Sequence, residues 1–337
     1  PSQQLLNIFK TEPYLQKMRE FIKTAPKESW EMMDLILRFD FQDMLSPIDK
    51  IDLLNRQLLF NFHIYVSRSK ILTDSIKSIK GNSMKNALLI VSFMNEKGVD
   101  DGGMLRDWFT SISHALIKSQ YFISVPDGCS LTFNSVKLDE NICYFTGQLI
   151  ALCITNKTTI NLKLTSFIWK QLMNENIDLD DLLDYDKQLY QSLKWISRND
   201  PSPMMLTFTN SHDKPLCKNG RSIQVTQKNK KQYIRLIMND ILINKNKKGI
   251  TKLVEGFHDS IDYTQYKCML KSDDIKRLII GVEEININDW KNNTIYPLAN
   301  SDQFHIFFDI ISKWNQENQR KLLKFVTGSS QIPINGF

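Results

Sequence analysis

Glycine, proline and cysteine are all scarce in this sequence, with 12 glycines, 10 prolines and five cysteines among 337 residues. So few glycines and prolines exclude a collagen-like or low-complexity chain. The cysteines are odd in number and never form a CxxC pair, which indicates reduced thiols and favours a cytoplasmic or nuclear location. Neither sign of charge dominates, because 43 basic and 37 acidic residues leave a net charge of +6. We therefore predict no nucleic-acid partner.

Long hydrophobic runs and cofactor motifs are missing as well. The longest apolar run, residues 142–154, is interrupted by polar residues and is too short to cross a bilayer, so we predict a buried helix and no membrane insertion. Histidines and cysteines lack the short, regular spacing of zinc ligands, and the turn at 98–103 lacks the lysine of a phosphate-binding loop. The acidic run 178–186 lacks the glycine and glutamate of a calcium loop and indicates a solvated helix start. We expect neither a metal nor a cofactor.

Hydrophobic residues make up 42% of the sequence, and their spacing predicts a mainly helical protein with short strands between the helices. Helices are predicted at 1–62, 105–116, 142–154, 274–280 and 304–314. Strands are predicted at 87–93, 204–209 and 221–225. After the last strand, Thr226 is a good N-cap for a helix that begins near Gln227.

Two neighbouring predicted elements, a helix over 186–197 and the strand over 204–209, each present apolar residues on one face. The helix repeats them at intervals of four and three residues, and the strand at every second position. The residues concerned are Leu189, Leu193, Ile196, Met204 and Leu206. They could wall a shallow groove or belong to the core, and periodicity alone does not decide between these two interpretations.

The turn that follows the predicted strand at 87–93 carries a distinctive motif. Residues 96–109 read EKGVDDGGMLRDWF. This string resembles the signature E-x-G-x-D-x-G-G-x-x-R-E-[WF]-F of HECT-type ubiquitin ligases, with Asp107 in place of the usual glutamate. Residues 145–152 resemble the family's F-x-G-R-L-L-G-L helix, apart from Gln148 and Ala151. Later matches follow in the family's order, at 181–195, 219–233, 256–257, 289–296 and 325–337, and such an ordered series is far more specific than one motif.

The resemblance implies an α+β fold of two lobes. Residues 1–281 would form a large, mainly helical N-lobe, with a small subdomain at about 160–225 that binds a ubiquitin-conjugating enzyme. Residues 282–284 would be a hinge, and 285–337 the first part of a smaller α/β C-lobe.

The resemblance also implies a docking groove on the small subdomain. In the family, the conjugating enzyme inserts a loop aromatic residue into this groove. The matching positions here are Leu189, Leu193, Ile196, Met204, Leu206 and Tyr233. Burying one aromatic ring contributes about 2 kcal/mol, which suits weak, exchangeable docking. The implied partners are a conjugating enzyme, ubiquitin and protein substrates with acceptor lysines.

The family's reaction needs a cysteine that accepts ubiquitin as a thioester and passes it to a substrate lysine. This cysteine lies in a T-C-F-like loop beyond the T-G-S-S segment, and the 337 residues contain no such loop. The cysteines present are expected to be small buried apolar residues, and they are Cys129, Cys143, Cys153, Cys217 and Cys268. We therefore expect a piece of a ligase that is inactive in transfer. The alternatives are a non-catalytic protein that binds conjugating enzymes and a helical interaction module with no link to ubiquitin.

Overall fold

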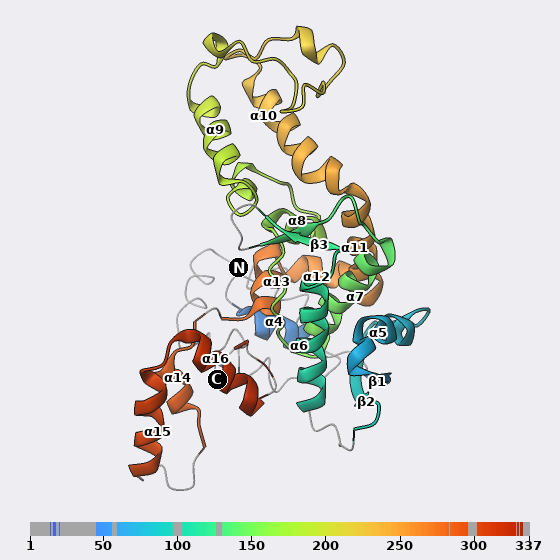
Figure 1. Ribbon diagram of the computed structural model, residues 1–337, viewed down its shortest axis with the longest axis vertical. Helices are drawn as coiled ribbons and strands as arrows, with labels where there is room; N and C mark the ends of the chain where they lie inside the picture. The colour runs from blue at the N-terminus through green and yellow to red at the C-terminus, as the bar shows by residue number, and fades with distance from the viewer. Residues whose placement is uncertain are drawn as a thin grey trace. The chain divides into compact units, whose positions relative to one another are not determined.

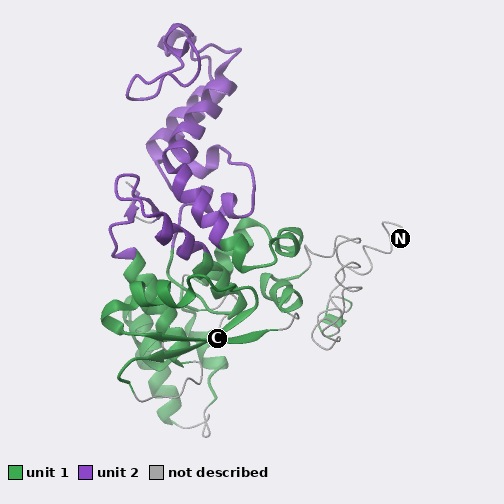
Figure 2. Ribbon diagram, turned by 90° about the vertical axis from the view of Figure 1, so that its right-hand side faces the viewer, with its two compact units in different colours: residues 1–116, 148–162, 257–337 green, residues 117–147, 163–256 purple. Residues whose placement is uncertain are grey.

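The computed structural model describes residues 45–55, 59–96, 103–125, 130–282, 284–295, 302–327, 329 and 331–332, together with Tyr14, Gln16, Lys17 and Glu20. The chain divides into two compact units, which Figure 2 colours separately. Unit 1 comprises 1–116, 148–162 and 257–337, and unit 2 comprises 117–147 and 163–256. Within the described ranges, no helix combines the length and the apolar character that crossing a bilayer requires.

Unit 1 begins, in its described part, with helices around a small parallel sheet (Figure 1). Its elements are α4 (Pro47–Leu54), β1 (Phe60–Val66), η2 (Arg68–Lys70), α5 (Ile71–Ile79), β2 (Ala87–Phe93), α6 (Gly103–Ile117), the second half of α7 (Glu140–Thr155), α12 (Tyr263–Met269), α13 (Ser272–Ile280), α14 (Ile287–Asn292), α15 (Asp302–Ser312) and α16 (Gln316–Thr327). The helix predicted over 1–62 falls mostly outside the described residues. The last part of this prediction is wrong, because the strand β1 begins at Phe60.

The predicted strand at 87–93 is confirmed as β2, which pairs in parallel with β1. Every second residue of β2 is buried, as expected for a strand with one face against a core. The predicted helix at 105–116 is confirmed as α6, and Trp108, Phe109 and Ile112 are fully buried. The Trp108 indole donates a 2.9 Å hydrogen bond to the Ser75 hydroxyl, so α6 is tied to α5 beside the sheet.

The two ends of the signature motif meet at one side chain. The Arg68 guanidinium donates to the carboxylate of Glu96 and lies 2.7 Å from that of Asp107. It also lies 3.9 Å from the centre of the Phe93 ring. The hydrogen bond from Arg68 lowers the pKa of Glu96. Arg68 thus contacts both Asp107 and Glu96, which lie toward opposite ends of the motif. Residues 97–102, between these two, lie outside the described residues.

Beyond α13 the chain builds a hydrophobic cluster of its own. The cluster consists of Ile285, Trp290, Phe308, Ile311, Leu323 and Ile332. The predicted helix at 274–280 is confirmed as α13 and ends at Gly281, whose φ of +72° is accessible to glycine at little cost. A side chain at this position would clash, because its Cβ would lie 2.0 Å from the carbonyl oxygen of Ile332. The predicted hinge at 282–284 lies within unit 1, residue 283 is outside the described residues, and the hinge stays a prediction.

Unit 2 consists of a short hairpin, a set of helices and irregular loops (Figure 1). Its elements are β3 (Phe122–Ser124), β4 (Leu131–Phe133), the first half of α7, α8 (Ser166–Leu172), η3 (Leu179–Leu182), α9 (Lys187–Arg198), η4 (Ser202–Met204), η5 (Gly220–Ser222), α10 (Lys230–Met238), the π-helix η6 (Asn239–Ile243), η7 (Asn244–Asn246) and most of α11 (Lys247–Ser260). The buried helix predicted at 142–154 is confirmed as α7.

The strands predicted at 204–209 and 221–225 are wrong. A 3₁₀ turn ends at Met204, Met205 has a left-handed φ of +52°, and a second 3₁₀ turn occupies 220–222. An isolated β-bridge between Thr207 and Gln224 joins the two segments, in place of a continuous strand ladder. Short alternating patterns are weak evidence for a strand, and neighbouring Asn, Ser and Pro residues favour turns. The following helix begins at Lys230, three residues later than predicted, with Asn229 in place of Thr226 at the N-cap.

Candidate functional site

Helix α9 supplies the first wall of the candidate site. It begins after Asp186, whose side-chain oxygen accepts a 2.9 Å hydrogen bond from the backbone N–H of Leu189. This satisfies an N–H that the helix itself leaves unpaired. The predicted stripe is present: Leu193 and Ile196 are buried, and Leu189 is half-buried near the start of the helix.

Helix α10 supplies the second wall. Tyr233 is buried and packs edge to face against Phe208, with ring centres 5.5 Å apart. Burial raises the pKa of the Tyr233 hydroxyl, so the ring is neutral at physiological pH. The loop residue Phe208 is itself only 1% exposed. A buried aromatic pair therefore joins α10 to the loop between η4 and η5.

Polar bonds fix the two helices relative to each other. Lys230 is a buried residue, and its ammonium group donates a 2.8 Å hydrogen bond to the carbonyl of Asn199, the C-cap residue of α9. Asn229 accepts from the backbone N–H of Thr226 and donates to the carbonyl of Gln224. The adjacent Asn229 and Lys230 thus tie the start of α10 to the end of α9 and to the intervening loop.

A cavity of about 860 Å³ opens between these walls, wholly within unit 2. Four of the six residues predicted for the docking groove line it, namely Leu189, Leu193, Leu206 and Tyr233. Ile196 and Met204 are not among its lining residues; Ile196 is buried, and Met204 is exposed.

Further apolar residues line the cavity, among them Met205, Ile237 and Ile241. Ile237 and Ile241 follow Tyr233 at intervals of four, so helical spacing from Tyr233 could have identified them. No sequence pattern indicates Met205, because its position depends on a left-handed backbone conformation.

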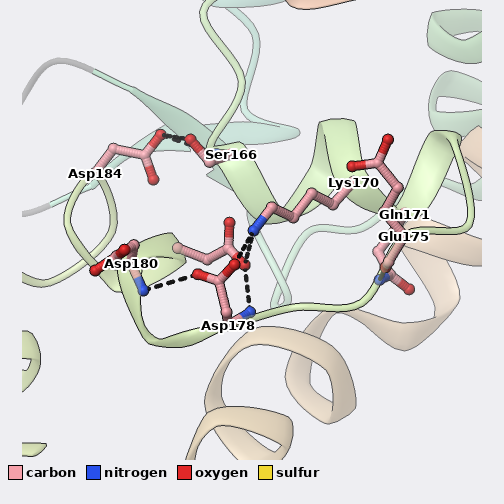
Figure 3. Close-up of polar contacts among 8 residues, drawn as sticks. Ser166, Lys170, Gln171, Glu175, Asp178, Asp180 and Asp184 are labelled. Atoms are coloured by element: carbon pink, nitrogen blue, oxygen red, sulfur yellow. Dashed lines mark hydrogen bonds and ion pairs between the residues drawn. The ribbon is translucent and has the colours of Figure 1, made fainter. Parts of the chain in front are cut away.

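The acidic run before α9 is engaged in capping and ion pairing, as Figure 3 shows. Lys170 on α8 lies 2.7 Å from a carboxylate oxygen of Asp178 and 2.9 Å from one of Asp181. Asp184 accepts hydrogen bonds from the backbone N–H and the hydroxyl of Ser166. The predicted solvated helix start is therefore wrong for Asp181, which is 2% exposed, because the fold supplies a cation to the buried carboxylate.

The expectation that every cysteine is buried is only partly met. Cys143 and Cys153 are buried, but Cys217 is half-buried and Cys268 is exposed. Cys129 lies outside the described residues. Burial raises the pKa of Cys143 to about 12 and that of Cys153 well above its ordinary value. These two thiols are not activated for nucleophilic attack.

We expect Cys268 to react with a maleimide at pH 7.5 in the native protein, whereas Cys143 and Cys153 should stay unmodified. The thiolate is the reactive species, and burial disfavours it at the two inner positions. Mass spectrometry of peptides after timed labelling measures this, and labelling in guanidinium chloride shows that all sites react once exposed. Rapid native labelling of Cys143 would contradict the burial described here.

A family model described as HECT-domain (ubiquitin-transferase) matches residues 110–337. The matched range begins after the signature at 96–109, so the match does not depend on that motif. The E3 ubiquitin-protein ligase TOM1-like of Neurospora crassa is 31% identical over 294 residues, covering 81% of this chain and 7% of that protein. The E3 ubiquitin-protein ligase NEDD4 of Mus musculus is 29% identical over 297 residues, covering 82% of this chain and 33% of that protein.

A plant relative gives the same result, since the E3 ubiquitin-protein ligase UPL1 of Arabidopsis thaliana is 29% identical over 299 residues, covering 81% of this chain and 8% of that protein. The chain thus spans only a minor part of the length of these relatives. The family model covers more than half of the chain. The mixed, mainly helical structure agrees with the α+β class. The chain therefore belongs to the HECT family of ubiquitin transferases.

Proposed function

We propose that this chain is the part of a HECT ubiquitin ligase that docks a ubiquitin-conjugating enzyme. The observation that supports this is the cavity between α9 and α10, because apolar and aromatic residues make up more than half of its lining and polar groups lie among them, which suits an aromatic side chain. The proposed docking residues remain Leu189, Leu193, Ile196, Met204, Leu206 and Tyr233, with Met205, Ile237 and Ile241 added.

The arrangement of groups around the cavity supports weak, specific docking. Lys230 and the Phe208–Tyr233 pair hold the walls before a partner arrives, so little conformational entropy is lost on binding. Leu189 and Leu206 are half-buried and Met205 is 79% exposed, which leaves apolar surface for a partner to cover. The proposed partner inserts one aromatic side chain between these residues.

In the complete ligase we propose acyl transfer without a cofactor. A cysteine thiolate would attack the thioester carbonyl of the charged conjugating enzyme and release that enzyme's thiolate. A substrate lysine amine would then attack the new thioester and form an amide, which returns the ligase thiolate. We propose that residues 1–281 form the N-lobe and 282–284 the hinge, with 285–337 in the C-lobe, a division that the separate cluster around Trp290 and Phe308 supports.

A non-catalytic protein that binds conjugating enzymes is the second candidate. The environments of Cys143 and Cys153 favour it for this chain taken by itself, because both thiols are buried with raised pKa values. It shares the docking step with the ligase and differs only in transfer. In both candidates the proposed partners are a conjugating enzyme and ubiquitin, and the ligase adds substrates with acceptor lysines.

Docking can be tested from the partner's side by isothermal titration of the 337-residue chain with a panel of ubiquitin-conjugating enzymes. Each enzyme is paired with a variant whose exposed loop aromatic is replaced by alanine. A contribution of about 2 kcal/mol predicts that this change weakens binding about 30-fold. The proposal is wrong if no enzyme binds, or if the paired enzymes bind with equal affinity.

A further inference from the structure

Positive charge is concentrated in one segment of unit 2, residues 187–246, which runs from the start of α9 to the end of η7. The segment contains 11 of the 43 basic residues and three of the 37 acidic ones, a net charge of +8. The rest of the chain has 32 basic and 34 acidic residues, a net charge of −2. The positive charge of the chain therefore lies in the segment that also supplies the proposed docking residues.

Most of this charge is exposed, and little of it is neutralised within the segment. Nine of the 11 basic residues are exposed. Of the three acidic residues, Asp213 lies 3.3 Å from Arg221, whereas Asp200 and Asp240 accept hydrogen bonds from neutral side chains. The segment therefore presents a strongly positive surface to solvent.

The basic residues lie around the walls of the cavity. On α9, Lys187, Lys194 and Arg198 follow at intervals of seven and four residues and share one side of the helix, beside its apolar stripe. Lys245 lines the cavity itself. Asp186 lines it too, but it is a single carboxylate and it caps the start of α9.

Helix α10 carries positive charge on its outer side. Lys231 and Arg235 lie one turn apart, and each is two residues from Tyr233, which places them on the opposite side of the helix from that ring. Lys228 is exposed in the turn before α10. Exposed charges act over about 8 Å at physiological ionic strength, so these cations influence an approaching partner without contacting the side chain that it inserts.

The aromatic residues of the segment favour a protein partner over a nucleic acid. Of its four aromatic rings, that of Trp195 is exposed and the other three are buried. Single-stranded nucleic acid is bound by successive exposed rings among basic residues, and this segment has one such ring. Protein interfaces combine an apolar centre with a polar rim, as the half-buried Leu189 and Leu206 do with the basic residues around them.

We propose that residues 187–246 form a basic surface that selects conjugating enzymes carrying acidic residues around the inserted aromatic side chain. Attraction between opposite charges speeds the encounter and orients the partner, so this surface acts mainly on the association rate. The identity of the partner rests on the proposed docking function, whereas the preference for an acidic face does not.

Stopped-flow association with a conjugating enzyme whose loop aromatic is flanked by acidic residues tests the surface. The triple variant Lys228→Gln, Lys231→Gln, Arg235→Gln removes three exposed cations that do not line the cavity. It should associate about fivefold more slowly than the parent chain at about 50 mM NaCl, and within about twofold at about 500 mM, because salt screens exposed charges. The dissociation rate should change by less than about twofold.

The matched control removes three exposed lysines from unit 1, in the triple variant Lys77→Gln, Lys80→Gln, Lys85→Gln. It changes the net charge equally and should associate like the parent chain. Equal slowing of both triple variants would assign the effect to total charge and overturn the inference.

Short peptides with blocked termini test the preference for an acidic face without any enzyme. One has a central phenylalanine flanked by four glutamates, and the other has four glutamines in their place. Methyl NMR of Leu189 and Ile237, which line the cavity, follows the titrations. We expect the glutamate peptide to bind about fivefold more tightly at about 50 mM NaCl, and more tightly than a five-nucleotide single strand of the same charge.

The inference is overturned if the two peptides bind alike, if the oligonucleotide binds more tightly than the glutamate peptide, or if the variant at 228, 231 and 235 associates as fast as the parent chain. Docking would survive that result wherever an enzyme still binds through its aromatic side chain. A glutamate peptide that is preferred while no enzyme binds would refute docking alone and support an acidic partner.

Discussion

Replacing Leu189 with glutamate is expected to weaken binding of a ubiquitin-conjugating enzyme by about 30-fold or more. Leu189 lines the cavity and is half-buried, so the substitution puts a carboxylate where the proposed partner would bury an aromatic ring. Burying that charge without a partner is costly in the complex, whereas water solvates it in the free protein. Isothermal titration measures the change in Kd, and thermal unfolding should show nearly the same melting temperature.

The matched control is Gln188→Glu, which adds the same charge at the preceding, exposed position of α9. It should leave the affinity within about twofold, because exposed charges contribute little. Leu193 is a poorer test position, since it is 2% exposed and a charge there would disturb folding as well as binding. Equal affinities of the Leu189 variant and the control would show that Leu189 is not part of the docking surface.

Replacing Lys170 with methionine should destabilise unit 2 by about 3 kcal/mol. The buried carboxylate of Asp181 would keep the backbone N–H of Asp178 as a hydrogen-bond donor, at 2.8 Å, but would lose its cation. Urea unfolding followed by tryptophan fluorescence is suitable, because Trp169 is buried on the same helix as Lys170. The exposed carboxylate of Asp180 provides a control, and Asp180→Asn should change stability by less than about 0.5 kcal/mol.

The Lys170→Met effect should depend on pH. Burial, the largest influence, raises the pKa of Asp181 above its ordinary value, although Lys170 and the N–H of Asp178 act in the opposite direction. The variant should have a still higher pKa at Asp181, because the cation is gone. A carboxyl group whose pKa is raised in the folded state lowers the stability of the fold above that pKa, where the group is ionised. Below that pKa the group is protonated, and this loss of stability disappears. The deficit of the variant should therefore be largest at neutral pH and shrink as the pH falls.

A double variant separates the ion pair from general packing. Lys170→Met combined with Asp181→Asn removes both charges but keeps a side-chain oxygen that can accept from the N–H of Asp178, and should regain most of the lost stability, since a neutral amide costs less to bury than an unpaired carboxylate. A double variant as unstable as Lys170→Met would show that the side-chain packing of Lys170, and not its charge, stabilises this region.

Apolar patterns predicted α6, α7 and the buried strand β2 correctly, although no helix was predicted where α11 and α16 lie. In α6, apolar residues recur with helical spacing over about three turns, an apolar run fills most of α7, and the first five residues of β2 are all apolar. These patterns are long enough to outweigh local preferences. The segments at 204–209 and 221–225 have only a few alternating residues, and their turn-forming neighbours decided the backbone conformation.

The sequence by itself determined the family, because several motifs occur in the family's order and the assignment does not depend on any single one of them. It also determined the stripe on α9, since Leu189, Leu193 and Ile196 share one helix face wherever the helix packs.

Only the tertiary structure decided which stripe residues line a cavity, because burial depends on what packs against a face. Leu193 lines the cavity, whereas Ile196 on the same stripe is buried without lining it. The pairing of Lys170 with Asp181 likewise depends on how α8 and η3 pack together, and no motif in the sequence indicates it. Local sequence patterns do not predict such contacts, because the contacts form only when the whole chain packs.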